Sequence, residues 1–195
     1  MFGQMELLDS VESTNDYLKQ FVEELEPRIV VAREQTAGKG RFGRVWNSPA
    51  GEGLYLSFLF YPDWKMANTE FLNVISSLSV AHAIRAVSDS APVVAVKHPN
   101  DVYLNGKKVC GILTELGSQG DRITWAVIGI GVNVYQSQFP PDLDQKATSL
   151  KLEGIEISDI LLLAEDIVTR LERLLESLRA GQWEKLEKEY RRSLL

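Results

Sequence analysis

Cysteine and histidine are scarce in this chain of 195 residues, which contains one cysteine, Cys110, and two histidines, His82 and His98. One cysteine cannot form an intrachain disulfide. Three such residues also fall short of the four ligands that a structural zinc site requires. We therefore expect a protein of the reducing cytoplasm that folds without a disulfide or a structural zinc ion.

Positive charge and long apolar runs are lacking as well. The chain has 27 Asp and Glu residues against 21 Lys and Arg residues, which gives a formal net charge of -6. Nucleic-acid binding through bulk charge needs clustered cations, so we expect no nucleic-acid partner. No segment approaches the roughly 20 apolar residues of a membrane span, and the N-terminal residues do not form a signal peptide. We expect no membrane partner and no export.

The hydrophobic pattern predicts an α+β fold with a mixed, largely antiparallel sheet and packed helices. Apolar residues at helical spacing predict helices over 12–25, 70–87, 158–178 and 183–190. Runs rich in β-branched and aromatic residues predict strands over 29–32, 54–60, 93–97 and 125–134. The Asn105-Gly106 pair predicts a hairpin between 101–104 and 107–116. We read His82, within the second helix, as structural and expect one domain over 1–195.

Glycine and positive charge coincide in the segment EQTAGKGRFGRVW, residues 34–46. Its glycines match the G-x-G-x-x-G pattern of dinucleotide-binding folds, but that pattern needs a helix after the loop. Pro49, Gly51 and Gly53 follow instead. We predict a flexible loop that presents Lys39, Arg41 and Arg44 to an anion such as a phosphate, and a solvated surface loop is the alternative.

A second polar group lies in KHPNDVYLNGKK, residues 97–108. Asn100 and Asp101 follow a predicted strand, and the hairpin brings Lys108 back toward them. Lys97, Asn100, Asp101 and Lys108 could therefore converge at one mouth of the sheet. The alternative is a plain turn followed by edge-strand charges that oppose aggregation.

In this order, the two segments resemble the biotin protein ligase family. GKGRFGR resembles its glycine- and arginine-rich loop, and KHPND resembles its Lys-Trp-Pro-Asn-Asp signature. Further similar segments occur in family order: STN at 13–15, EQTAG at 34–38, KVCGIL at 108–113, GIGVNV at 129–134 and FPPDLDQKATSL at 139–150. The resemblance implies a fold related to class II aminoacyl-tRNA synthetases. It departs at His98, which replaces the signature tryptophan, at Lys39, where arginine is frequent, and at Phe42, which interrupts the basic run.

The resemblance implies an ATP-dependent ligase that forms biotinyl-adenylate and transfers biotin to a lysine of a biotin carboxyl carrier protein. ATP, biotin and Mg²⁺ are the implied ligands, with no firm protein ligand for the metal, and a homodimer is possible for such proteins. A lipoate-type ligase, a non-catalytic biotin-binding module and an NAD-dependent enzyme are the alternatives. We expect neither an N-terminal helix-turn-helix nor a C-terminal β-barrel domain.

The same resemblance implies roles for individual residues. Lys108 and Arg41 are the expected catalytic cations. The expected biotin-binding residues are Ser13, Thr14, Asn15, Gln35, Lys39, Gly40, Arg41 and Lys108. The expected nucleotide-binding residues are Trp46, Asn100 and Asn133. Without the resemblance, Ser13 and Thr14 would be helix caps and Trp46 a core residue.

Overall fold

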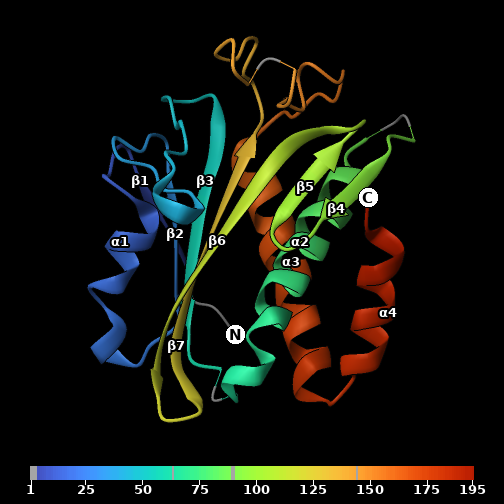
Figure 1. Ribbon diagram of the computed structural model, residues 1–195. Coiled ribbons are helices and arrows are strands. Elements are labelled where there is room, and N and C mark those ends of the chain that lie inside the picture. The colour runs from blue at the N-terminus through green and yellow to red at the C-terminus, as the bar shows by residue number, and fades with distance from the viewer. Residues whose placement is uncertain (1–3, 63, 89–90, 144) are drawn as a thin grey trace. The chain divides into compact units, whose positions relative to one another are not determined.

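The computed structural model describes residues 4–62, 64–88, 91–143 and 145–195. These residues form a seven-stranded sheet with the order β1-β2-β3-β7-β6-β5-β4 (Figure 1). β1 pairs parallel to β2, whereas the β2–β3, β4–β5 and β5–β6 pairs are antiparallel. The strands are β1 (Met5–Leu8), β2 (Arg28–Ala32), β3 (Gly53–Phe60), β4 (Val94–Lys97), β5 (Asp101–Leu104), β6 (Lys107–Gln119) and β7 (Arg122–Asn133). The predicted mixed, largely antiparallel sheet is confirmed.

The chain divides into two compact units, each built from two segments. The first unit comprises Met1–Leu72 and Ile112–Gly131, and the second comprises Asn73–Gly111 and Val132–Leu195. Strands β6 and β7 contribute residues to both units. The expectation of a single domain stays a prediction.

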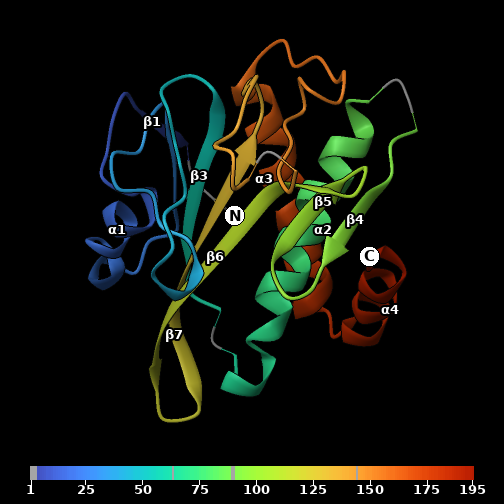
Figure 2. The same ribbon diagram turned by 45° about the horizontal axis from the view of Figure 1, so that its top comes forward.

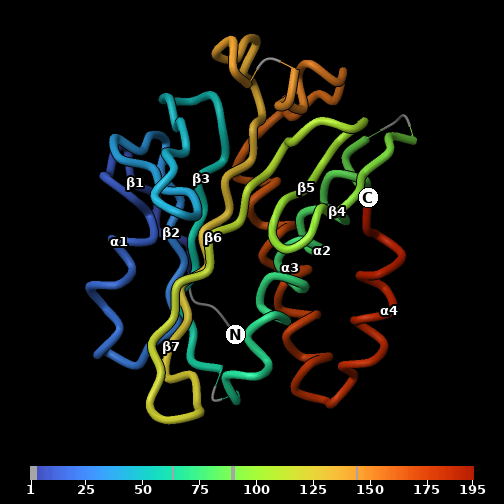
Figure 3. The backbone as a smooth tube through the Cα atoms, in the orientation of Figure 1, coloured from blue at the N-terminus to red at the C-terminus, as the bar shows by residue number. Residues whose placement is uncertain are grey.

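In the first unit, the short helix α1 (Thr14–Lys19) packs on β2 and β3 (Figure 3). Leu18 is fully buried there in a cluster with Val30, Leu59 and Val127. Helix α1 begins as the sequence predicts but ends about six residues earlier, and a 3-10 turn over Val22–Glu24 follows. The phenol of Tyr61 donates to the Val22 carbonyl at 3.1 Å, which satisfies an acceptor that a longer helix would have used.

In the second unit, helix α3 (Ile160–Arg179) packs on α4 (Trp183–Ser193), and α4 packs on β4 (Figure 2). Both helices match the predicted ones to within three residues, as does α2 (Glu70–Ala86). His82 Nε2 lies 3.1 Å from Glu189 Oε1, so this histidine has a partner on α4, and its structural role stays a prediction. Burial lowers the pKa of His82, although the Glu189 carboxylate opposes this shift.

Two features of the sheet were not predicted. Strand β1 is a four-residue edge strand whose two middle residues are exposed. Its sequence, MELL, has no alternation of apolar and polar residues from which a strand could be predicted. Strands β6 and β7 extend beyond the predicted ends to Gln119 and back from Arg122, with Gly120 at a φ of +62° between them. None of the described helices combines the length and apolar character needed to cross a bilayer.

The buried contacts of α1 predict a large effect of truncating Leu18. Leu18→Ala should lower the free energy of unfolding by about 2–5 kcal/mol, because it leaves a cavity among Val30, Leu59 and Val127. Leu25→Ala is the matched control, since Leu25 is 72% exposed. Urea denaturation measures both variants, and equal effects would contradict this packing.

Candidate functional site

Three consecutive polar residues at the start of α1, Ser13 to Asn15, are almost completely buried. Ser13 is the N-cap, and its hydroxyl accepts from the backbone N–H of Asp16 at 3.4 Å. Thr14 donates to Gln35 Oε1 from its backbone N–H and contacts the same oxygen with its hydroxyl, both at 2.9 Å. The capping role assumed for Ser13 is confirmed, whereas Thr14 makes a contact 21 residues away in the chain.

Gln35 joins these residues to the loop that follows β2. Its Nε2 donates to Ser48 Oγ at 2.9 Å, and Ser48 donates in turn to the Trp46 carbonyl at 3.1 Å. Gly38 lies against this chain, and a Cβ at that position would overlap the Trp46 carbonyl. Sequence reasoning named Gln35 but not Ser48, which the structure shows to be its partner.

Asn15 uses its carboxamide entirely within the first unit. Its Nδ2 donates to Glu115 Oε2 at 2.8 Å and to the Leu113 carbonyl at 3.3 Å. Its Oδ1 lies 2.7 Å from the hydroxyl of Ser57, a fully buried residue of β3. Ser57 also lies 2.7 Å from Thr14 Oγ1. We call the side chains of Asn15, Ser57, Thr14 and Gln35 the buried polar chain.

Alternate glycines on β7 leave room for two side chains of this unit. A Cβ at Gly129 would overlap Asn15 Oδ1, and a Cβ at Gly131 would overlap the indole of Trp46. Trp46 is half-buried. This intermediate exposure does not decide between a core residue and a nucleotide-binding residue. The GIGVNV segment therefore makes space for two predicted site residues, a role that its sequence alone did not reveal.

The basic loop is a small hairpin. Backbone hydrogen bonds join Gly40 N to the Arg44 carbonyl at 2.8 Å and Trp46 N to the Gly38 carbonyl at 2.9 Å. Phe42 at its tip has a φ of +59° and is 86% exposed, and the Arg41 guanidinium lies 4.8 Å from the centre of its ring. No helix follows the hairpin, because the chain runs on into β3. The dinucleotide-binding alternative therefore lacks the helix that it requires.

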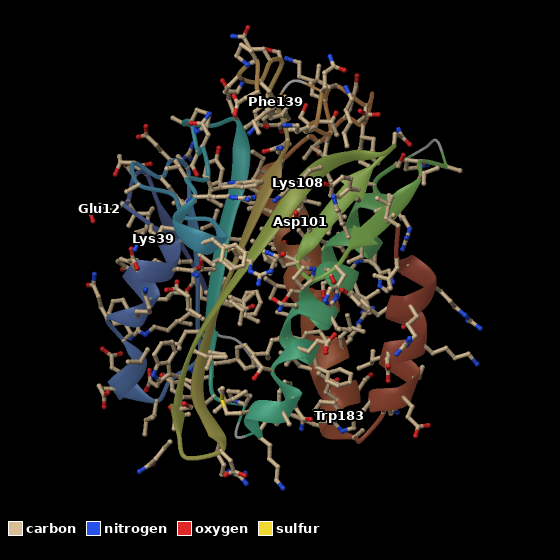
Figure 4. The ribbon with its side chains drawn as sticks, in the orientation of Figure 1. Glu12, Lys39, Asp101, Lys108, Phe139 and Trp183 are labelled. Atoms are coloured by element: carbon tan, nitrogen blue, oxygen red, sulfur yellow. The ribbon has the colours of Figure 1, made fainter. Side chains whose placement is uncertain are left out.

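A chain of ion pairs connects the basic loop to the buried polar chain. Lys39 Nζ lies 2.5 Å from Asp16 Oδ2, and Lys19 Nζ lies 2.7 Å from both Asp16 Oδ1 and Glu115 Oε1. Figure 4 shows Lys39 beside α1. Burial opposes ionisation of Asp16, but hydrogen bonds and charge from the two lysines outweigh it and hold the pKa of this carboxyl below its usual value.

In the second unit, Lys108 pairs with Asp101. Their Nζ and Oδ1 atoms are 2.7 Å apart, and Figure 4 labels both residues on the β5–β6 hairpin. The backbone of Lys108 is also held, because its N–H donates to the Lys146 carbonyl and its carbonyl accepts from Thr148 N–H, both at 2.9 Å. The predicted hairpin therefore brings Lys108 to Asp101, as the sequence suggested.

The other residues predicted in this group are placed differently. Lys97 Nζ lies 3.4 Å from the Tyr103 hydroxyl and 5.1 Å from the centre of its ring. Asn100 is half-buried, and His98 Nδ1 lies 3.3 Å from the Tyr190 hydroxyl. Lys97 is the register partner of Asp101, and Tyr103 is the register partner of Lys108, so Lys97 lies on the same face as the Lys108–Asp101 pair. The expected convergence of these residues on one site stays a prediction.

Asn133 is buried at the end of β7 and supports the segment that holds Lys108. Its Nδ2 donates to the Thr148 carbonyl at 2.9 Å, and its backbone carbonyl accepts from Leu150 N–H at 3.1 Å. Gln136 Nε2 lies 3.5 Å from Asn133 Oδ1. These contacts give Asn133 a positioning function in the second unit. Residue 144, within the 139–150 segment noted in the sequence, lies outside the described residues.

The family of the chain follows from comparison with known proteins. Residues 7–133 match the model of the biotin/lipoate A/B protein ligase family. The chain belongs to this family. The predicted resemblance is thereby confirmed at the level of the family.

Relatives within the biotin/lipoate A/B protein ligase family are longer than this chain. The bifunctional ligase/repressor BirA of Bacillus spizizenii is 42% identical over 127 residues, which cover 64% of this chain and 38% of that protein. BirA of Escherichia coli is 32% identical over 194 residues, which cover 95% of this chain and 60% of that protein. The chain thus spans between 38% and 60% of the length of these curated relatives.

A solved structure from the same family confirms the fold. The biotin protein ligase from Aquifex aeolicus in complex with biotin and ATP matches with a TM-score of 0.86 and 30% sequence identity. The match covers 100% of this chain and 79% of that one. The predicted fold class of biotin protein ligases is therefore confirmed.

The space beside Asn15 generates a test of the buried polar chain. Gly129→Ala should destabilise the protein by roughly 1–3 kcal/mol, because the new methyl group overlaps Asn15 Oδ1. In the double variant with Asn15→Ala the overlap is absent. The double variant should therefore be more stable than the sum of the two single effects predicts. Additive effects in thermal unfolding would show that Gly129 and Asn15 are not in contact.

Proposed function

We propose that this chain carries the catalytic activity of a biotin protein ligase, which forms biotinyl-adenylate from biotin and ATP and transfers biotin to a lysine of a biotin carboxyl carrier protein. The observation that carries the proposal is the buried polar chain. Three of its side chains, those of Thr14, Asn15 and Ser57, are buried, and that of Gln35 is half-buried. Burial of polar side chains is costly unless each finds partners, so a site built this way suits a polar ring. The bicyclic urea of biotin offers N–H and C=O groups, whereas the dithiolane of lipoate offers neither.

We assign the recognition of biotin to the first unit. Ser13, Thr14 and Gln35 are proposed to hydrogen-bond biotin. Asn15 was also expected to bind biotin, but its carboxamide is engaged with Leu113, Glu115 and Ser57, so we propose that it holds Ser57 in place beside Thr14. Lys39, Gly40 and Arg41 belong to the hairpin that is proposed to close over biotin and its adenylate. Trp46, half-buried against Gly131, is proposed to contact the nucleotide. The A. aeolicus relative that matches this chain was solved with biotin and ATP, which supports both ligands.

The second unit is proposed to supply the remaining groups. Lys108 is a cation whose backbone forms hydrogen bonds with Lys146 and Thr148, so its position is well defined. We propose that it acts on the carboxylate of biotin and the α-phosphate of ATP, with Asn100 and Asn133 on the nucleotide side. Without a ligand, the Asp101 carboxylate forms an ion pair with Lys108, and an anionic ligand would compete with Asp101 for this lysine.

The chemistry explains why cations are needed. An oxygen of the biotin carboxylate forms a bond to the α-phosphorus of ATP, and the bond to pyrophosphate breaks with its electron pair leaving on pyrophosphate. Both reactants are anions, so Lys108, Lys39 and Arg41 would offset their repulsion and the charge that develops on the leaving group. The amine of the carrier lysine then attacks the carbonyl carbon, AMP leaves, and the amine loses a proton.

Mg²⁺ fits this proposal as a companion of ATP. Among the described residues, no three His, Cys, Asp or Glu side chains are grouped as a metal site. We therefore propose that Mg²⁺ binds chiefly through the phosphates of ATP, where it would neutralise their charge. A cytoplasmic location is also proposed, since the one cysteine, Cys110, is buried and free.

Biotin-dependent exchange of pyrophosphate into ATP tests the proposal and the role of Lys108. The wild-type chain should catalyse exchange, and Lys108→Ala should lower the rate by roughly 100- to 1,000-fold, as expected when one charged donor to a transition state is lost. Lys107→Ala is the matched control on the same hairpin and should retain the rate. Biotin binding without exchange in the wild type would favour a non-catalytic biotin-binding module.

The basic hairpin should become protected from trypsin when biotin and ATP bind. Lys39, Arg41 and Arg44 are three cations on one exposed loop, so an anionic ligand that binds them should hold the loop in place and slow cleavage after all three residues. Cleavage after the exposed Arg122 serves as the internal control. Protection that is unchanged at saturating biotin and ATP would mean that the hairpin does not close over the ligand.

Loss of Arg41 should weaken retention of the adenylate. Arg41→Gly is expected to release biotinyl-adenylate faster and to modify bystander lysines more than the wild type, because a closing contact is missing. Arg33→Gly, which removes an exposed cation just beyond β2, is the control. Chase experiments with preformed adenylate measure release, and equal rates for Arg41→Gly and wild type would rule out this role.

A further inference from the structure

Ser57 occupies the middle of the buried polar chain, and no expectation from the sequence assigned it a role. It is 0% exposed on β3, opposite Val30 of β2. Its hydroxyl oxygen lies 2.7 Å from Thr14 Oγ1 on one side and 2.7 Å from Asn15 Oδ1 on the other. A hydroxyl has one proton, so it can donate to only one of these neighbours.

The neighbour that receives this proton is determined by the orientation of Asn15. The Nδ2 group faces two acceptors, the Leu113 carbonyl at 3.3 Å and Glu115 Oε2 at 2.8 Å. The opposite orientation would place the amide oxygen against two oxygens, so Oδ1 must face Ser57. Because a carbonyl oxygen only accepts, the Ser57 hydroxyl must donate to Asn15.

The other end of the chain is oriented by the same reasoning. Gln35 Oε1 accepts from the backbone N–H of Thr14 at 2.9 Å, and Gln35 Nε2 donates to Ser48 Oγ at 2.9 Å. Reversing this amide would place its NH₂ group against an N–H donor. Gln35 Oε1 therefore also faces the Thr14 hydroxyl as an acceptor, at 2.9 Å.

The count of protons then fixes the state of Thr14. Three contacts join oxygen atoms along Gln35, Thr14, Ser57 and Asn15, but only the two hydroxyl groups supply protons. The proton of Ser57 goes to Asn15, and the proton of Thr14 goes to either Gln35 or Ser57. In both arrangements, the Thr14 oxygen receives no hydrogen bond from the described residues. It can accept from a ligand but has no proton left to donate.

We propose that Ser57 and Asn15 are positioning residues that make Thr14 a hydrogen-bond acceptor, so that the site selects a ring with an N–H group beside Thr14. The inference rests on the proposed function, since biotin is the ligand whose ureido N–H would donate there. Ser57 and Asn15 would thus contribute to ligand selection without contacting the ligand, because the hydrogen bond from Ser57 to Asn15 leaves the Thr14 oxygen free to accept from the ligand. The dithiolane of lipoate, which has no such donor, would leave Thr14 unsatisfied.

The test compares biotin with two lactam analogues, each of which replaces one ureido N–H by CH₂. Wild type should prefer biotin over one of the two analogues by roughly 10- to 100-fold, the usual range for an unsatisfied buried acceptor. Asn15→Ala frees the Ser57 proton for Thr14, so this preference should fall at least about fivefold. Adding Ser57→Ala to Asn15→Ala removes that proton and should restore much of the preference.

Ser79→Ala is the matched control for the loss of a buried serine hydroxyl. Ser79 lies on α2, is 0% exposed, and donates to the Ile75 carbonyl of its own helix at 2.6 Å. It should leave the preference for biotin unchanged. Calorimetric titration of each variant with the three ligands gives the preference as a ratio of dissociation constants. A general loss of stability would not lower this ratio in Asn15→Ala and then raise it again when Ser57→Ala is added.

A second measurement needs no ligand. The side-chain NH₂ of Asn15 should give two resolved, slowly exchanging proton resonances in wild type and in Ser79→Ala, and these should shift in Ser57→Ala because the amide oxygen loses its donor. Unchanged resonances would overturn the proton direction inferred for Ser57. If wild type binds biotin without preferring it over either lactam, the inference fails while the proposed function stands. If wild type binds no biotin, the proposed function fails and the Asn15 resonances alone decide the proton direction.

Discussion

The first unit depends on the locked carboxamide of Asn15. Its nitrogen is held by Glu115 and the Leu113 carbonyl on β6, and its oxygen by Ser57 on β3. Helix α1 is fixed by these bonds on its polar side and by buried Leu18 on its apolar side. Gly129 on β7 is required because any side chain there would occupy the same space. One amide thus connects a helix and three strands, and Thr14 and Gln35 take their positions from it.

Electrostatic pairing reconciles the acidic composition of the chain with the anionic ligands that we propose for it. The net charge is -6, yet Lys39 and Lys108 are presented by a hairpin each, and each is paired with a carboxylate, Asp16 and Asp101. Such partly exposed pairs stabilise a fold by about 0–1 kcal/mol at most. A phosphate or carboxylate ligand can therefore take over the lysine at little cost. The carboxylates keep the cations in place and do not compete strongly with a bound anion.

Local patterns in the sequence predicted much of the fold. The Asn105-Gly106 turn, the buried run of β3 and the apolar stripes of α2 and α3 are all properties of neighbouring residues, and the structure places them within a few residues of the predicted limits. Helix α1 was predicted too long because the contact that accompanies its early end comes from Tyr61, 39 residues away in the chain and just after β3. Strand β1 was missed because four residues on a sheet edge give little pattern.

The predicted site residues came from motifs, whereas their partners could not be found that way. Ser57 lies 42 residues from Asn15 in the chain, and Glu115 lies 100 residues from it, so no spacing indicates either contact. The alternating glycines Gly129 and Gly131 were the available signal, since glycine within a strand often marks a close approach of another group. The sequence does not show which side chains approach these glycines, because Asn15 and Trp46 are brought to β7 only by the folding of the chain.

Equilibrium binding of biotin and lipoate to the wild-type chain tests the central claim most directly, that the buried polar chain selects a ring bearing N–H donors. Calorimetric titration should show saturable binding of biotin and a lipoate affinity lower by at least about 100-fold, because the dithiolane cannot satisfy buried polar groups. Lipoate binding as tight as that of biotin would contradict the account.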